Sequence, residues 1–150
     1  MLAIEILRLH PAARVPLRAL SESAGFDLFA LLLSESGRAI KRMISVRATV
    51  AIPTGIAIRP PKGHVALVCT RSGYAKHNIF VANSPGVIDP DYTGEISVLL
   101  YNGGYDPYYI EHEHRIAQLI VVPLPFITTR LVDELPNTER GVSGFGSTGR

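Results

Sequence analysis

The sequence is poor in cysteine and in net charge. Its 150 residues include one cysteine, Cys69, which cannot form a disulfide within the chain or supply a cysteine cluster for a metal. The 15 basic and 13 acidic side chains give a net charge of only +2, too small to favour nucleic-acid binding by charge alone. We therefore expect neither a disulfide-stabilised scaffold nor a nucleic-acid-binding protein.

Long hydrophobic runs are also absent. The longest, residues 116–127, is interrupted by Gln118 and two prolines, whereas a membrane helix needs about 20 apolar residues. The first ten residues carry Glu5 and Arg8 inside their apolar run, which differs from the charged and then apolar order of a signal peptide. These features predict a cytoplasmic protein that does not bind a membrane.

The sequence does contain enough apolar residues for one core. Hydrophobic residues make up 47% of the chain and charged residues 19%, and a chain of this length is typically one domain. Short runs with a period of two, at 44–52, 65–69 and 96–100, are typical of half-buried strands. The pattern predicts an all-β sandwich, jelly roll or barrel. For residues 26–44, a helix and a strand followed by a loop are equally compatible.

The C-terminal end differs from the rest of the chain. Residues 140–150, RGVSGFGSTGR, have no periodicity and few apolar side chains, which predicts a mobile tail. We therefore divide the chain into a β domain at 1–139 and a tail at 140–150. Arginine outnumbers lysine by twelve to three. This bias fits phosphate binding, for which the guanidinium fork is suited, and it equally fits codon bias in a GC-rich genome.

Two segments in the first half of the chain do not fit a plain alternation of strands and turns. SAGFDLFA (23–30) holds Asp27 in apolar surroundings, and TRSGYAKHN (70–78) presents Arg71, Ser72 and Gly73 in succession. The second segment offers a fork donor, a hydroxyl and a bare backbone, and exposed N–H groups in such a turn bind anions. Each segment alone is also compatible with an ordinary turn.

The segment NSPGVIDPDYTGE (83–95) combines an amide with two carboxylates. The side chain of Asn83 offers both donors and an acceptor, which suits the amide edge of a pyrimidine base. Asp89 and Asp91 follow two residues apart, and Tyr92 comes next. A hairpin with solvated turn aspartates is the alternative interpretation.

Two further segments lie near the C-terminus. RIAQLI (115–120) places Gln118 in an apolar strand, where a buried amide needs hydrogen-bond partners. The tail combines Arg140 and two hydroxyl residues with a lone Phe145 among glycines, a composition that a plain linker does not require. The sequence has no P-loop, no dinucleotide-binding glycine motif and no cysteine–histidine spacing for zinc.

In this order and spacing, the five segments resemble the five motifs of the trimeric dUTP pyrophosphatases (dUTPases), over nearly the whole chain. The resemblance implies a β jelly roll that assembles as a homotrimer, in which each active site takes motifs from all three subunits. It implies that the tail of one chain closes a neighbouring site. It also implies Mg²⁺-dependent hydrolysis of dUTP to dUMP and pyrophosphate, which limits uracil in DNA and supplies dUMP.

The resemblance also assigns catalytic and phosphate-binding roles. Asp89 corresponds to the aspartate that orients and deprotonates the water attacking the α-phosphorus. Asp27 corresponds to a carboxylate near the metal, acting through a metal-bound water. The phosphate contacts fall on four residues of the second and fourth motifs: Arg71, Ser72, Gly73 and Gln118.

Base and sugar selection would rest on the third motif. By the resemblance, Asn83 pairs with uracil with help from the backbone around Gly86 and Ile88, and Tyr92 lies under the deoxyribose and leaves no room for a 2′-hydroxyl. In the tail, Phe145 would stack on the uracil. The other substrate-binding residues of the tail, with the γ-phosphate held by the arginine and the two hydroxyls, would be Arg140, Gly146, Ser147 and Thr148.

Four positions depart from the family pattern. Thr70 stands where the family usually has proline, and Tyr74 stands where it usually has leucine. Pro90 after the catalytic aspartate is uncommon, and Ser143 replaces the usual glycine, which could strain the tail if a positive φ is needed there.

Two alternative functions remain. A dCTP deaminase, a relative with the same fold, carries a catalytic glutamate five residues after the last glycine of the third motif. Here that glycine is Gly94, and the fifth residue after it is the apolar Leu99. A jelly-roll binding or regulatory module without catalysis would be expected to lose Asp89, Arg71 or the tail, and all of these are present.

Overall fold

The computed structural model describes residues 2–142. The expectations for Ser143, Phe145, Gly146, Ser147 and Thr148 therefore lie outside the described residues. In chain order, the described strands and the one short helix are β1 (Glu5–Arg8), β2 (Phe26–Phe29), β3 (Lys41–Ile44), β4 (Thr49–Pro53), β5 (Ile56–Arg59), β6 (His64–Cys69), α1 (Ser72–Ala75), β7 (Ile79–Val81), β8 (Gly86–Ile88), β9 (Ser97–Asn102), β10 (Tyr108–Glu111) and β11 (Arg115–Pro123).

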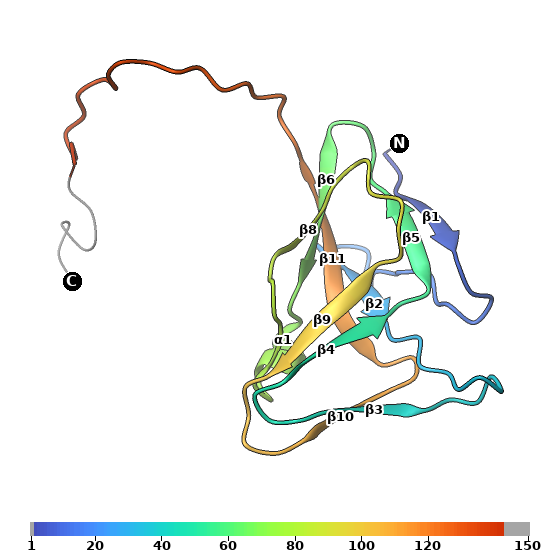
Figure 1. The fold of residues 1–150 in the computed structure, drawn as a ribbon. Coiled ribbons are helices and arrows are strands. Elements are labelled where there is room, and N and C mark those ends of the chain that lie inside the picture. Colours follow the sequence, from blue (N-terminus) through green and yellow to red (C-terminus); the bar gives the residue numbers. More distant parts are fainter. Residues whose placement is uncertain (1, 143–150) are drawn as a thin grey trace.

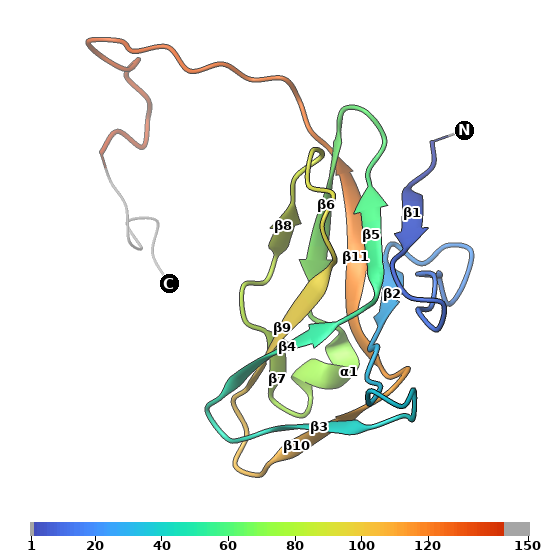
Figure 2. The same cartoon turned by 45° about the vertical axis from the view of Figure 1, so that its right-hand side comes forward.

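The strands form four antiparallel sheets. The largest has four strands in the order β2–β11–β6–β8, a second has three in the order β4–β9–β7, and the pairs β1–β5 and β3–β10 complete the fold. Strand β9 crosses in front of β11 in Figure 1, and the turned view of Figure 2 shows the same two layers. The expected all-β, jelly-roll-like fold is confirmed, since the only helix among residues 2–142 is the four-residue α1.

The core lies between the two larger sheets. Strand β9 shows the alternation that the sequence predicts, because Ile96 just before it, Val98 and Leu100 are each 1% exposed. They belong to the same core cluster as Ile116 and Leu119 of β11, which are 0% exposed. Burying side chains of this size contributes about 1.5–3 kcal/mol each.

Two of the alternating runs behave differently from the simple expectation. The run at 44–52 is not one strand, because β3 ends at Ile44 and β4 begins only at Thr49. Between them the chain reverses direction with Arg47 at φ 61°, where its N–H donates to the carbonyl of Asn102. Hydrophobic alternation cannot reveal this break because a turn without glycine or proline leaves no signal in the pattern.

The run at 65–69 forms β6. Its alternation predicts that the face with Leu67 and Cys69 is the buried one, but the opposite face is buried more deeply. Ala66 and Val68 are 0% and 4% exposed, whereas Leu67 and Cys69 are half-buried. Strand β6 lies between β11 and β8, and Val65 is also buried. An interior strand covered on both faces carries no clean alternation.

Residues 26–44 form the strand β2 followed by a loop and β3, which decides between the two alternatives left open by the sequence. After β11, residues 124–142 contain no strand and extend away from the sheets, as the orange-to-red segment of Figures 1 and 2 shows. Within the described part of the chain, no helix has the length and apolar character to cross a membrane.

Candidate active site

A cleft of about 320 Å³ opens beside β2 and β11. Five of the residues predicted to bind substrate or metal line it: Asp27, Arg71, Ser72, Gly73 and Gln118. The structure therefore brings together the first, second and fourth motifs, which lie far apart in the sequence. The remaining wall comes from the loop before β2, through Ala19, Ser23, Ala24 and Gly25.

Strand pairing explains this convergence. Strand β11 lies between β2 and β6, so that Gln118 stands opposite Asp27 on one side and opposite Cys69 on the other. Strand β6 ends at Cys69, and the chain then passes through Thr70 and Arg71 into α1. The register of one central strand thus fixes three motifs at one end of the sheet.

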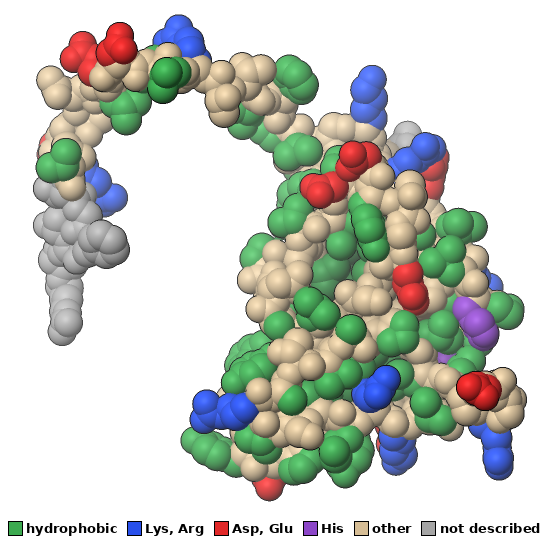
Figure 3. Space-filling model, in the orientation of Figure 1, with side chains coloured by type: hydrophobic (Ala, Val, Ile, Leu, Met, Phe, Trp, Pro, Cys, Tyr) green, Lys and Arg blue, Asp and Glu red, His purple; other side chains and the backbone are tan. Residues whose placement is uncertain are grey.

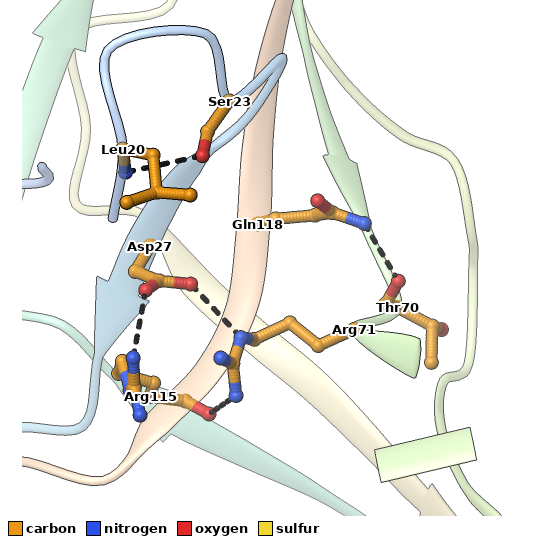
Figure 4. A network of polar contacts seen from close by, with 7 residues as sticks. All are labelled: Leu20, Ser23, Asp27, Thr70, Arg71, Arg115 and Gln118. Carbon is orange, nitrogen blue, oxygen red and sulfur yellow. Dashed lines mark hydrogen bonds and ion pairs between the residues drawn. The ribbon is translucent and has the colours of Figure 1, made fainter. Parts of the chain in front are cut away.

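Asp27 is the most buried charged group of the cleft, with 8% of its surface exposed. Its Oδ1 accepts a hydrogen bond from Arg71 Nε at 2.9 Å, and its Oδ2 lies 3.5 Å from Arg115 Nη1. Arg71 also donates from Nη1 to the backbone carbonyl of Arg115 at 3.1 Å. Figure 4 shows one guanidinium group at each oxygen of the carboxylate. One buried carboxylate therefore orients two cations.

Sequence reasoning gave Arg115 no role in this site. Its only signal was its position at the start of the fourth motif, and a single arginine on a strand is usually a solvated surface residue. The contact with Asp27 depends on the pairing of β11 with β2, which local sequence does not specify. Gly25 was missed for a similar reason, since its neighbours are set by the same pairing.

Gln118 has the partner that a half-buried amide requires. Its Nε2 donates to the carbonyl of Thr70, just after the neighbouring strand β6, at 3.0 Å, as Figure 4 shows. Gly25 lies against the other end of the amide, where an added Cβ would stand 2.8 Å from Gln118 Oε1. The absence of a side chain at Gly25 therefore makes room for the glutamine.

Ser72 and Gly73 begin the short helix α1 and are exposed. Nothing lies within 4 Å of the position that a Cβ on Gly73 would take, so an anion can approach this backbone closely. Next to them, burial raises the pKa of Tyr74 to about 12, and the charge of Tyr108 acts in the same direction. Tyr74 thus stays neutral beside the cleft at ordinary pH.

The third-motif residues do not line this cleft within the chain. Asn83 packs its amide over Gly86, where a Cβ would lie 3.1 Å from Nδ2. Asp89 is exposed, and Ile88 is half-buried at the end of β8. None of the residues of the 83–95 segment is therefore among those that line the cleft.

Tyr92 lies on the same segment, and its ring covers Gly94. Its hydroxyl donates to the carbonyl of Glu95 at 3.0 Å, although the residue is 45% exposed. The carboxylate of Glu95 in turn accepts from the N–H of Gly55 at 2.7 Å. These contacts hold the tyrosine ring in one orientation. Arg140 lies on the extended 124–142 segment and is exposed.

The side chains of the cleft suit contact with a magnesium ion through water rather than direct ligation. Among residues 2–142, no group of three or more histidine, cysteine, aspartate or glutamate side chains is placed to hold a metal ion. Both oxygens of Asp27 already face guanidinium groups. Mg²⁺ usually keeps several waters and binds through substrate phosphates with one or two carboxylates. The cleft therefore suits an ion carried by a polyphosphate and reached by Asp27 through water.

An all-β fold with a cleft built from guanidinium, hydroxyl, amide and bare backbone groups has the chemistry of a protein that binds a phosphorylated ligand. The family model for dUTPase matches residues 12–149 of this chain. The deoxyuridine 5′-triphosphate nucleotidohydrolase of Orientia tsutsugamushi (strain Boryong) is 38% identical over 146 residues, covering 97% of this chain and 95% of that protein. The chain belongs to the dUTPase family.

Solved structures agree with this assignment. A mutant of the Staphylococcus bacteriophage 80alpha dUTPase with dUpNHpp has a TM-score of 0.85 at 25% identity, and the match covers 99% of both chains. A mutant dUTPase from phage phi11 of S. aureus has the same fold, with a TM-score of 0.75 at 22% identity over 88% of this chain and 97% of that chain.

Proposed function

We propose that this chain hydrolyses dUTP to dUMP and pyrophosphate by attack of water on the α-phosphorus. The observation that carries the proposal is the convergence of Asp27, Arg71 and Gln118 on one cleft in a dUTPase-family fold. Support also comes from the Orientia relative, whose name gives this activity and which matches nearly the whole chain.

The cleft supplies the groups that phosphoryl transfer requires. Such reactions depend on positioning and charge stabilisation more than on covalent chemistry. Arg71, Ser72 and Gly73 bind the phosphates with a guanidinium, a hydroxyl and exposed backbone, and Gln118 contacts the phosphates or their waters. Because Asp27 already fixes the Arg71 guanidinium, little reorganisation is needed when substrate binds.

Asp89 acts as the base that orients the attacking water and accepts its proton. Its exposure on the 83–95 segment supports this role, because a free carboxylate can turn toward a substrate held by another chain. General-base catalysis contributes roughly 10²–10⁴-fold to a rate, and alignment of the water contributes more.

Magnesium is the proposed cofactor, with Asp27 as its contact through water. The phi11 phage dUTPase structure reveals coordination of a structural Mg(II) ion. When bound with the substrate, the ion offsets negative charge on the phosphates. The residues of this chain then bind, align and shield the triphosphate.

Selection of the base and sugar is assigned to the 83–95 segment. Asn83 pairs with the uracil edge, assisted by the backbone of Gly86 and Ile88, and a wrong base would leave buried polar groups unpaired. Tyr92 lies under the deoxyribose. Its hydroxyl bond to Glu95 supports a fixed ring that collides with a 2′-hydroxyl.

The active unit is proposed to be a homotrimer with shared sites. One reason is that the third-motif residues do not line the cleft formed by the first, second and fourth motifs in the same chain. A second reason is the extended segment 124–142, whose hydrophobic side chains lie away from the main body of the protein in Figure 3. Its most exposed large apolar residues, from 77% to 107%, are Phe126, Ile127, Leu131, Leu135 and Val142. Their exposure fits burial of this segment against another chain.

The tail 140–150 is proposed to close the site of a neighbouring chain, with Arg140, Ser147 and Thr148 on the γ-phosphate and Phe145 on the uracil. The domain 1–139 would then carry the rest of the site. Closure excludes water and strengthens the charge interactions inside. The single Cys69 fits the proposed cytoplasmic location.

The alternatives have weaker support. Leu99, at the position where a deaminase would carry its glutamate, lies on β9 and cannot transfer a proton. A module without catalysis would not need Asp89 or the orientation of Arg71 by Asp27.

A nucleotide panel tests the proposal. With Mg²⁺, the purified protein should release pyrophosphate from dUTP and far less from dTTP, dCTP or UTP. Removal of the metal with a chelator should stop the reaction, and added Mg²⁺ should restore it. Release of ammonia from dCTP would favour the deaminase, and equal turnover of UTP would refute the role of Tyr92.

A further inference from the structure

Thr70 contacts three separate parts of the chain through three different atoms. Its carbonyl accepts a hydrogen bond from Gln118 Nε2 at 3.0 Å, as Figure 4 shows. Its hydroxyl accepts from the N–H of Val81 at 2.9 Å, and its own N–H makes a longer contact of 3.4 Å with Ser84 Oγ. Thr70 thus joins the end of β6 to the start of the turn that carries Asn83.

The hydroxyl is the atom that depends on residue type. Any residue would offer its carbonyl to Gln118, but only serine or threonine would place a hydroxyl here. Val81 is 3% exposed, so removal of the hydroxyl would take a partner from a buried N–H. Leaving such a donor unpaired carries the full cost of its desolvation.

The hydrogen bond between Val81 and Thr70 lies where strand β7 leads into the turn that carries Asn83. Strand β7 ends at Val81, and Ala82 makes the last backbone bond to β9, through Leu99. From there the chain turns at Ser84, whose N–H donates to the carbonyl of Val81. The Thr70 hydroxyl therefore holds the backbone by a side-chain hydrogen bond at the point where the exposed turn leaves the sheet.

We propose that Thr70 is a positioning residue for base recognition: its hydroxyl holds the 81–86 turn in the orientation that presents Asn83 to uracil. The proposal rests on the proposed function, since it takes Asn83 as the uracil-binding side chain. Thr70 touches no reacting atom.

Two ligands that each carry only part of the substrate distinguish this role from a general loss of order in the site. dUMP carries the base and sugar with one phosphate, and pyrophosphate carries only the phosphate part. Calorimetric titration of Thr70→Val should show dUMP affinity falling about threefold to tenfold, as expected for one lost hydrogen bond. Pyrophosphate affinity, measured with Mg²⁺, should stay within about twofold, because the carbonyl bond to Gln118 remains. The KM for dUTP should rise more than kcat falls.

Two further variants complete the test. Thr70→Ser keeps the hydroxyl and should restore dUMP affinity. Ser34→Ala removes another hydroxyl that accepts a backbone N–H, from Arg38, on a turn away from the cleft, and should leave both affinities unchanged. If Thr70→Val does not fold, Ser84→Ala removes the exposed contact to the Thr70 N–H and should weaken dUMP binding in the same direction.

The proposal is overturned if folded Thr70→Val binds dUMP as the native chain does. A parallel loss of dUMP and pyrophosphate affinity would also overturn it, as would failure of Thr70→Ser to restore binding. With Ser84→Ala as the only folded variant, unchanged dUMP affinity would overturn it. A native chain that neither hydrolyses dUTP nor binds dUMP would instead contradict the proposed function, so the two failures are distinguishable.

Discussion

Arg71 Nε donates a hydrogen bond to Asp27 Oδ1 at 2.9 Å. The two side chains are 25% and 11% exposed, so solvent screens this pair less than a surface ion pair. Because Nε and one Nη of Arg71 are already engaged by Asp27 and by the Arg115 carbonyl, the guanidinium faces the cleft in a fixed orientation. Asp27 therefore fixes the orientation of the guanidinium that is proposed to bind the phosphates.

Asp27→Asn should lower kcat/KM for dUTP by at least about tenfold, because a hydrogen bond to a charged partner contributes roughly 1.5–3 kcal/mol. Steady-state kinetics on the purified variant measure this effect. Glu5→Gln is the control, since it removes the exposed ion pair with Arg59 between β1 and β5 and should leave kcat/KM unchanged. Full activity of Asp27→Asn would show that Arg71 needs no such restraint.

Asp89→Asn should abolish turnover and keep dUTP binding within about threefold, because loss of a general base removes roughly 10²–10⁴-fold from the rate. Single-turnover kinetics and calorimetric binding of dUTP give the two quantities separately. Asp91→Asn, two residues along the same exposed segment, is the matched control and should remain active. Persistent turnover in Asp89→Asn would assign the base to another residue.

Deletion of residues 140–150 should reduce activity and leave assembly intact. The apolar residues of the extended segment, such as Leu131 and Leu135, precede the deletion, so the surface proposed for assembly is retained. Light scattering measures the mass of the assembly, and kinetics measure activity. A truncated chain with full activity would remove the tail from the mechanism, whereas a monomeric one would place the tail in the interface.

Gly25→Ala should lower kcat/KM, because the new Cβ would stand 2.8 Å from Gln118 Oε1 and 3.2 Å from Gln118 Cβ. Overpacking of this kind costs typically 1–3 kcal/mol, unless the neighbour shifts, and here the shift would displace an amide of the cleft. Gly103→Ala is the control, with a Cβ at 3.2 Å from the Tyr101 ring and away from the cleft. It should change the melting temperature without changing kcat/KM.

These contacts show where sequence reasoning succeeds and where it ends. The alternation at 96–100 and the apolar context of Asp27 are local, so the strand and the candidate residue could be predicted. The contacts of Arg115 and Gly25 arise from the pairing of β11 with β2, which depends on residues almost ninety positions apart. The turn at Arg47 could not be predicted from the sequence because its positive φ occurs without glycine.

The burial of Tyr74 predicts that the stability of the fold decreases at alkaline pH. It is 8% exposed and lies against Tyr108 at 5.7 Å between ring centroids, and burial raises its pKa to about 12. An ordinary tyrosine ionises near pH 10. Between about pH 10 and 12 the unfolded chain therefore loses this proton while the folded chain keeps it. Because the folded state then binds more protons, stability is fully present below pH 10 and falls as the pH rises toward 12.

Thermal unfolding at pH 9, 10 and 11 measures this loss, which is of the order of 1 kcal/mol at pH 11 for a raised pKa of this size. Tyr74→Phe removes the ionisable hydroxyl and should flatten the decline between pH 10 and 11. Tyr109→Phe, at a position 54% exposed, should keep the decline of the native chain. If the decline in Tyr74→Phe equals that of the native protein, the alkaline loss belongs to other groups, and burial of Tyr74 has no role in it.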